Sequence, residues 1–166
     1  AALVVFDERG ADLLTLAAVA ARTKVATPSL YKHVRSLAEL RALAAARVRA
    51  DLGAQLRQAL LGRSGEDAVV TLLRAHQEFA DRHPHRYALA VGHDDPGPAG
   101  SADQVDAVLA AALRGYGLEP DALRHTVHAL RTVALASAAL GSSEAARLLL
   151  AGVLTAGLRS LAAHPA

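Results

Sequence analysis

Histidines are the first candidates for chemistry in this 166-residue sequence, because four of its eight lie between positions 76 and 93, where two aspartates follow. Imidazole and carboxylate ligands suit zinc or nickel. The spacing of His76, His83, His85 and His93 matches no established ligand set. We therefore expect these side chains to be solvated or to line a pocket, and we predict neither a metal site nor a cofactor.

Catalysis needs a nucleophile and a base that converge, and the sequence offers no such pair. Ser137, Ser142 and Ser143 lie near a helix break, but no nucleophile-elbow motif surrounds them. Cysteine is absent, which excludes a thiol nucleophile, disulfides and thiolate metal sites. Glu78 and Asp81 lie among arginines at helical spacing, the pattern of a solvated helix face. The sequence therefore predicts that the protein is not an enzyme.

A third group of polar residues, between Thr15 and Arg41, points to nucleic-acid chemistry. The segment reads TLAAVAARTKVATPSLYKHVRSLAELR. It predicts a short helix, a turn of three or four residues and a second short helix, which together form the helix-turn-helix unit. The polar residues expected on the exposed face of the second helix, at the end that enters the major groove of DNA, are Thr27, Ser29, Tyr31, Lys32 and His33.

Helices with clear start signals must position these side chains. Thr15 is expected to cap a helix over residues 16–22. Thr27 is expected to cap the second helix, with Pro28 at its first position, where a missing N–H costs nothing. This second helix, over residues 28–34, would be only about two turns long.

A small core must hold these helices together. Leu30 and Val34 lie four residues apart on one face of the second helix, and Val25 in the turn is expected to close the core with them. Ser36 and Glu39 form a capping box that opens a long helix from residue 37 to about residue 61. With a first helix over residues 1–9, this predicts a compact three-helix head on a longer fourth helix.

Charge is distributed unevenly along the chain. Residues 1–50 hold eight Lys and Arg against four Asp and Glu, a balance of +4, so the remainder carries −2 of the formal net charge of +2. A basic N-terminal third on a mildly acidic body is what a nucleic-acid-binding protein needs. The most apolar stretch, taken as residues 132–140, is shorter than the roughly 18 residues of a membrane span, and we recognise no signal peptide. We expect a cytoplasmic protein with no membrane partner.

The rest of the chain predicts a helical body. Hydrophobic residues make up 52% of the chain and no alternating strand pattern occurs. We expect an all-α fold of eight to nine helices, with a helix-turn-helix DNA-binding domain over residues 1–47 and a regulatory and dimerisation domain over residues 48–166. Helices over 120–140 and 143–163 are separated only by Gly141 and Ser142, which predicts an antiparallel hairpin.

Both helices of the expected hairpin are apolar over more than one face. One face can be buried against the body, and the surplus predicts pairing with the same hairpin of a second subunit; burial of both faces within one subunit is the alternative. The residues expected at the homodimer interface are Leu130, Val133, Leu149, Val153, Leu154 and Leu158. A twofold protein would read DNA half-sites about 34–36 Å apart, or a multiple of that distance.

The first 47 residues resemble the DNA-binding domain of TetR-type regulators. The resemblance rests on Thr15-Leu16, Val19-Ala20, Val25, Ser29-Leu30-Tyr31, His33-Val34 and Leu37 with Leu40. The candidate contacts to double-stranded DNA are Thr15, Thr27, Pro28, Ser29, Tyr31, Lys32, His33 and Arg35. The turn departs from the family, which usually has glycine where Lys24 stands, so strain is expected there if the backbone needs a positive φ.

The resemblance also implies a homodimeric repressor whose body binds an unknown small-molecule effector and then releases DNA. The residues expected to line the effector pocket are Phe79, Tyr87, Leu109, Leu113, His128 and Leu135. The alternative is a helical ligand-binding or protein-interaction module that keeps this fold without reading DNA.

Overall fold

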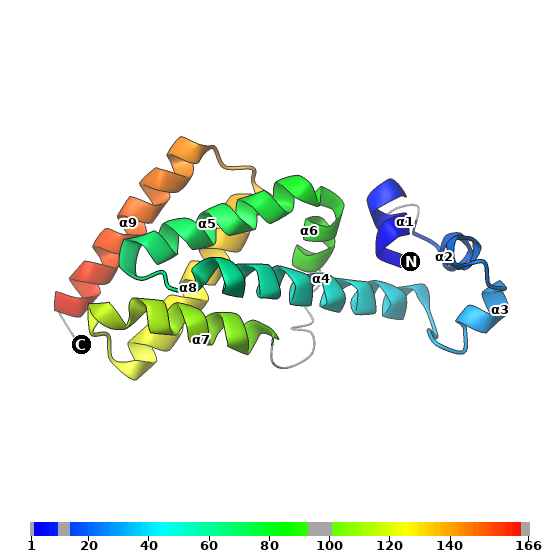
Figure 1. Ribbon diagram of the computed structural model, residues 1–166, viewed down its shortest axis with the longest axis horizontal. Helices are drawn as coiled ribbons and strands as arrows, with labels where there is room; N and C mark the ends of the chain where they lie inside the picture. The colour runs from blue at the N-terminus through cyan, green and yellow to red at the C-terminus, as the bar shows by residue number, and fades with distance from the viewer. Residues whose placement is uncertain (1, 10–13, 93–100, 164–166) are drawn as a thin grey trace.

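The structure is a computed structural model that describes residues 2–9, 14–92 and 101–163. Within these ranges the chain forms helices and no strand, which confirms the expected all-α fold. The helices are α1 (Ala2–Arg9), α2 (Leu16–Thr23), α3 (Thr27–Leu30), α4 (Leu37–Leu60), α5 (Gly65–Arg82), α6 (Pro84–Val91), α7 (Ser101–Leu113), a 3-10 turn (Arg114–Tyr116), α8 (Pro120–Ala139) and α9 (Glu144–Ala163). Figure 1 shows an elongated molecule in which α1–α3 form a head at one end, and α4 leads from it into a body of α5–α9.

The first helix of the helix-turn-helix begins as predicted. The Thr15 hydroxyl accepts a hydrogen bond from the Ala18 N–H (3.1 Å) and caps α2. The helix ends in a Schellman turn around Lys24, which has a left-handed backbone (φ 56°, ψ 34°) and donates its N–H to the Ala21 carbonyl (3.2 Å). Among the described residues, Lys24 is the one non-glycine residue with a positive φ. It is therefore the strained residue expected in the turn.

The second helix is shorter than predicted, and its cap is different. α3 covers only Thr27–Leu30 rather than residues 28–34. The N–H groups of Lys32 and His33 donate to carbonyls three residues back (3.3 and 2.9 Å), and this tighter pairing ends the α-helical ladder. Because α3 begins at Thr27 itself, the cap position falls on Ala26, which provides no side-chain hydrogen bond. The predicted Thr27 cap is therefore wrong.

The head has a small core of its own. Its buried side chains are Val5, Phe6, Leu14, Val19, Val34, Leu40, Ala44 and Ala45, together with Leu89 from α6 of the body. Leu30 packs against this cluster as predicted. Val25 does not, because it follows the left-handed residue of the Schellman turn and is 44% exposed. The prediction that Val25 closes the core is therefore wrong.

Helix α4 belongs to both parts of the molecule. It begins as predicted with the Ser36 hydroxyl accepting from the Glu39 N–H (3.1 Å), although the Glu39 carboxylate accepts from the Arg35 N–H (2.6 Å) instead of that of Ser36. Its buried residues up to Ala45 belong to the head core, and its buried residues from Val48 onward belong to the body core. The predicted boundary at residue 47 thus falls inside a continuous helix, between the two clusters.

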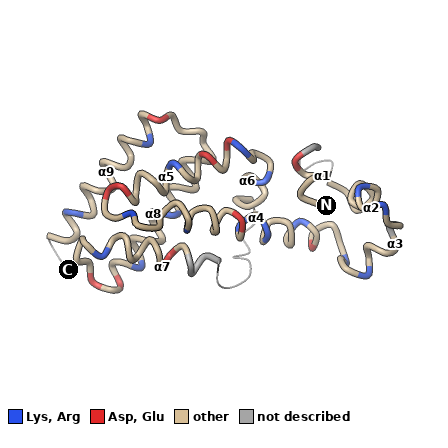
Figure 2. The backbone as a smooth tube through the Cα atoms, viewed as in Figure 1, with Lys and Arg blue, Asp and Glu red and all other residues tan. Residues whose placement is uncertain are grey.

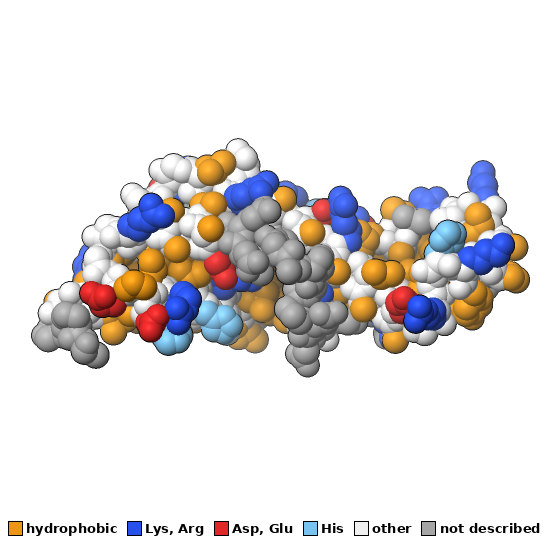
Figure 3. All heavy atoms as spheres, turned by 90° about the horizontal axis from the view of Figure 1, so that it is seen from below, with side chains coloured by type: hydrophobic (Ala, Val, Ile, Leu, Met, Phe, Trp, Pro, Cys, Tyr) orange, Lys and Arg blue, Asp and Glu red, His pale blue; other side chains and the backbone are white. Residues whose placement is uncertain are grey.

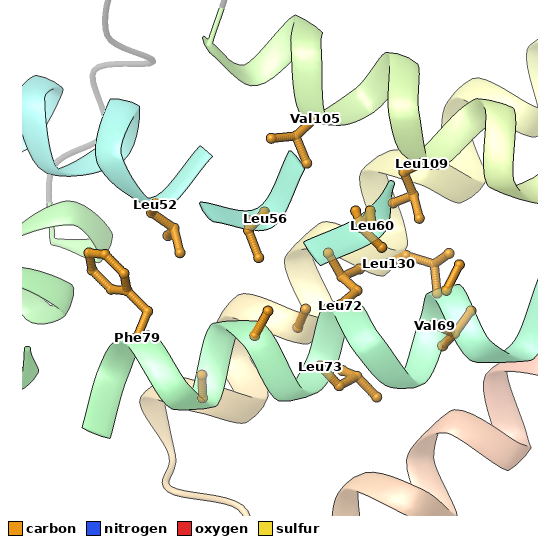
Figure 4. Close-up of a cluster of buried hydrophobic side chains, with 14 of the residues drawn as sticks. Leu52, Leu56, Leu60, Val69, Leu72, Leu73, Phe79, Val105, Leu109 and Leu130 are labelled. Carbon is orange, nitrogen blue, oxygen red and sulfur yellow. The ribbon is translucent and has the colours of Figure 1, made fainter. Parts of the chain in front are cut away.

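The body is built around α5, which contacts α4, α6, α7, α8 and α9. Figure 4 shows buried apolar side chains of α5 together with those of α4, α7 and α8. They are Leu52, Leu56 and Leu60 of α4, Val69, Leu72, Leu73 and Phe79 of α5, Val105 and Leu109 of α7, and Leu130 of α8. Leucine and valine at helical spacing therefore supply most of the core, as the low aromatic content requires.

The last two helices do not form the predicted hairpin. They run in opposite directions (Figure 1), but α9 packs along α5, and α8 packs on α5, α6 and α7. Four residues, 140–143, separate the helices instead of the expected two, which gives α9 room to reach a different side of α5. An ion pair between Arg159 of α9 and Glu66 of α5 (3.2 Å) joins these two helices.

Replacing Lys24 by glycine should stabilise the protein. The left-handed conformation costs a non-glycine residue about 1 kcal/mol, and the greater freedom of glycine in the unfolded chain offsets part of that gain. We expect Lys24→Gly to raise the free energy of unfolding by about 0.5 kcal/mol, measured by denaturant titration. The control Arg22→Gly, in ordinary helical backbone, should lower it by about 1 kcal/mol. Equal effects of the two substitutions would show that Lys24 is not strained.

Candidate nucleic-acid interface

The predicted contacts to DNA gather at the tip of the head. α3 lies at the opposite end of the molecule from α9 (Figure 1). Leu30 and Val34 pack into the head core, whereas the polar side chains around them face solvent. The exposed members of the predicted set are Thr15, Pro28, Ser29, Tyr31, Lys32, His33 and Arg35. Thr27 is the first residue of α3.

This tip is strongly basic. Between residues 14 and 46 the sequence has five Lys and Arg against one acidic residue, Glu39, whose carboxylate accepts from the Arg35 N–H. Figure 2 shows basic positions on α2, in the turns before and after α3 and near the start of α4, and Figure 3 shows Lys and Arg side chains exposed around the head. Such a surface attracts the phosphate backbone of DNA.

The exposed side chains suit two kinds of DNA contact. Lys32 and Arg35 carry positive charges that suit phosphates. Ser29 and His33 have donors and acceptors that can read base edges, and Tyr31, which is 54% exposed, offers an amphipathic ring for the sugar-phosphate backbone or a thymine methyl. Because α3 is so short, the turn that follows it belongs to the same surface.

A bridge that the sequence did not predict joins the head to the body. The Arg86 guanidinium of α6 forms a bidentate ion pair with Asp7 of α1, with Nε 2.8 Å from Oδ1. The hydrogen bond from Arg86 to Asp7 raises the pKa of Arg86 further above its ordinary value. Beside this pair, the Phe6 ring meets the His85 ring edge-on, with 6.4 Å between centroids. Asp7 and Arg86 are 79 residues apart, so no local pattern indicates that they pair.

Helix α6 is also linked to the body by buried hydrogen bonds of Tyr87. The Tyr87 hydroxyl donates to the Leu135 carbonyl of α8 (3.0 Å) and lies 3.2 Å from Nδ1 of His76 in α5. Burial, together with the positive charge of Arg131, lowers the pKa of His76 to about 4. Burial also raises the pKa of Tyr87. Both side chains are therefore neutral at pH 7.

The predicted pocket residues fall into two groups. Phe79, Tyr87, Leu109 and Leu113 are buried in the body core, and Leu135 is partly buried against it. His128 is exposed on α8 and does not lie with them, so we remove it from the set. Apolar spacing alone does not show which side of α8 faces the core.

The other histidines have separate neighbours. His83 packs on Phe79 with 5.3 Å between ring centroids, and His85 packs on Phe6. His93 lies outside the described residues. Where the structure describes the chain, no group of three or more His, Asp or Glu residues is arranged to hold a metal ion.

Helix α9 presents an apolar face to solvent. Leu149 and Val153 lie one turn apart on this helix and are 73% and 69% exposed. The other exposed leucines on and just before α9 are Leu140, Leu148 and Leu161. Exposed apolar patches of this kind are typical of interaction surfaces.

Two of the predicted interface residues are placed elsewhere by the structure. Leu130 and Leu158 are buried within the subunit, in the same cluster as the residues of α5, so their assignment to a dimer interface is wrong. They turn inward because α8 and α9 each bury one face on α5. Val133 and Leu154 are partly buried.

α9 is also more apolar than the sequence interpretation recognised. Among the described residues it is the one helix that is long and apolar enough to cross a membrane by length and composition. The most apolar stretch is therefore not residues 132–140, because residues 148–158 contain no charged side chain. α9 packs along α5 of the helical body, and Arg159 near its end pairs with Glu66.

Comparisons with known proteins agree with this arrangement. Residues 1–45 match the model for bacterial regulatory proteins of the tetR family, and residues 69–141 match that for the tetracyclin repressor-like C-terminal domain. The chain is 32% identical over 137 residues to the HTH-type transcriptional regulator YobS of Bacillus subtilis, an alignment that covers 80% of this chain and 71% of YobS. The protein therefore belongs to the TetR family, a family of regulators and not of enzymes.

A mycobacterial relative is similar over a stretch of comparable length. The chain is 36% identical over 122 residues to the HTH-type transcriptional regulator Rv0681 of Mycobacterium tuberculosis. This alignment covers 71% of the chain and 56% of Rv0681, so the match spans little more than half of that relative's length.

Acid should destabilise the body through His76. The pKa of this imidazole falls from its ordinary 6.5 to about 4 on folding, so the unfolded chain takes up the proton first as the pH falls. Between pH 6.5 and pH 4 the free energy of unfolding should drop, by roughly 3 kcal/mol at most from this group, and the effect should end below pH 4. Denaturant titrations across this range measure the drop. His76→Phe should lose this part of the pH dependence, and an unchanged dependence in the variant would assign it to other groups.

Proposed function

We propose that the protein is a DNA-binding transcriptional regulator that reads DNA with α3 and the turn after it. The observation that carries the proposal is the exposed basic surface on a helix-turn-helix whose apolar side is buried. Leu30 and Val34 anchor the segment, which leaves Ser29, Tyr31 and Lys32 free to enter a major groove. The two relatives named as transcriptional regulators support this function, and the cytoplasm is where a bacterial regulator meets its DNA.

We also infer that the regulator acts as a twofold homodimer. The exposed face around Leu149 and Val153 is apolar, and residues 148–158 carry no charge that would oppose pairing with a second copy. Covering this face removes apolar surface from water, which stabilises by about 25 cal/mol for each Å². A twofold axis would place two heads on two related half-sites of DNA.

A small molecule bound in the body would act on the head through α6. Arg86 and Leu89 of this helix contact the head, and Tyr87, on the same helix, bonds to α8 and contacts His76 of α5. An effector that binds beside Tyr87 and prefers another position of α6 would reorient the head. It would weaken DNA binding by the difference between its affinities for the two positions. The contacts of α6 with both the head and the body support a repressor that its ligand releases from DNA.

Binding to DNA from upstream of its own gene tests the regulator function. We expect tight binding to one pseudo-palindromic site, weak binding to scrambled duplex and a steep dependence on salt. Lys32→Ala should weaken binding to every sequence by a similar factor and reduce the logarithmic salt slope by about 1. Fluorescence anisotropy over a salt series measures both quantities.

The matched control for this experiment is Arg124→Ala, which removes an exposed charge of α8 in the body. It should leave affinity and salt slope unchanged. If specific and scrambled DNA bind equally weakly, the protein is a helical ligand-binding or interaction module without DNA recognition.

A single charge on α9 should separate the two subunits. Val153→Glu would place a carboxylate in the apolar interface, close to its twofold copy, where burial of like charges is costly. We expect a monomer by light scattering at concentrations where the unmodified protein is a dimer. Leu61→Glu adds the same charge at an exposed leucine just after α4, and this variant should stay dimeric. A dimeric Val153→Glu variant would place the interface elsewhere.

A further inference from the structure

Leu135, Tyr87 and His76 form a buried hydrogen-bonded group in the body. This group ends in a ring nitrogen of His76, Nε2, that has no hydrogen-bond partner. Tyr87 has one O–H, and we assign its hydrogen to the Leu135 carbonyl, 3.0 Å away, because a carbonyl oxygen can only accept. The Tyr87 oxygen must then accept from Nδ1 of His76, 3.2 Å away. Since a neutral imidazole carries only one ring hydrogen, Nε2 of His76 is left as a bare acceptor.

This acceptor is enclosed by protein. His76 is 3% exposed, and Nε2 has no hydrogen-bond partner. Buried polar atoms nearly always have a partner, because a buried acceptor without a donor is less stable than one in water. A donor from a bound molecule would satisfy it.

The side chains near His76 determine which kind of donor group is favoured at Nε2. The centroid of the Phe79 ring lies 6.3 Å from that of the Tyr87 ring, so an aromatic surface adjoins this hydrogen-bonded group. Arg131, one turn before Leu135, is close enough for its positive charge to act on His76, and it pairs with Asp106 of α7 (2.7 Å). This positive charge disfavours an ammonium donor at Nε2, whereas a neutral hydroxyl is compatible with it.

We propose that Nε2 of His76 anchors the effector, and that the effector is a neutral, apolar molecule whose hydroxyl donates to this nitrogen. The site rests on the proposed function as a ligand-released regulator. An effector at His76 would contact the group bonded to Tyr87, and α6 would carry its effect to Arg86 and Leu89 at the head.

Phenol and toluene are the probes that test this site, because they share a ring of similar size and only phenol donates a hydrogen bond. Titrated calorimetrically onto the full chain, phenol should bind about tenfold more tightly than toluene. In His76→Phe this preference should disappear. The variant should fold, because phenylalanine fills the space of the imidazole and Tyr87 keeps its bond to Leu135. The control His83→Phe, on a partly buried ring beside Phe79, should keep the preference.

Equal affinities for the two probes in the unmodified protein, no binding of phenol up to its solubility, or a preference that survives in His76→Phe would each overturn the site. Nitrogen-15 spectra of histidine-labelled protein give an independent readout. We expect the hydrogen of His76 on Nδ1 and a shift of the Nε2 resonance when phenol is added, and a hydrogen on Nε2 would overturn the assignment.

DNA binding of the same samples separates this site from the regulator function. If the unmodified protein binds specific DNA but shows no phenol preference, only the effector site fails. If it binds no specific DNA, the regulator function fails, whatever the probes show.

Discussion

The head depends on a leucine that the body supplies. Leu89 of α6 is buried among the residues of the head core, and Arg86 of the same helix pairs with Asp7 of α1. A unit of about 45 residues has too little apolar surface to be firmly stable alone, so this borrowed contact fixes the head on the body. Because Tyr87 of α6 is held by α8 and contacts α5, a change in the body core that moves α6 must also move the head.

The proposed DNA-binding surface is built from a short helix and a strained turn. Lys24 occupies a left-handed position that glycine would take without strain, and α3 ends after one turn, so residues 31–35 share the surface with it. The left-handed backbone at Lys24 costs some stability, and Lys24 adds an exposed positive charge beside the residues that we propose contact DNA. Residues that depart from a local backbone preference are common at binding sites, because function selects the residue there.

Features set by local chemistry are predictable from this sequence, and features set by distant contacts are not. The Thr15 cap and the start of α4 follow from residues three apart. The family resemblance predicts which residues of α3 and of the turn after it are exposed. By contrast, the packing of α9 on α5 depends on competition among several apolar faces, which spacing does not resolve. For the same reason Leu158 was assigned to the wrong face, and the buried pairing of His76 with Tyr87 across two helices left no signal in the sequence.

Hydroxyl-radical footprinting on the DNA upstream of the gene tests most directly whether two heads read DNA as a pair. A dimer held together through α9 should protect two patches related by a twofold axis, with centres about 34–36 Å apart or a multiple of that distance. The same pattern should appear on both strands in symmetric positions. A single protected patch, or uniform protection along the duplex, would contradict paired reading by two helix-turn-helix heads.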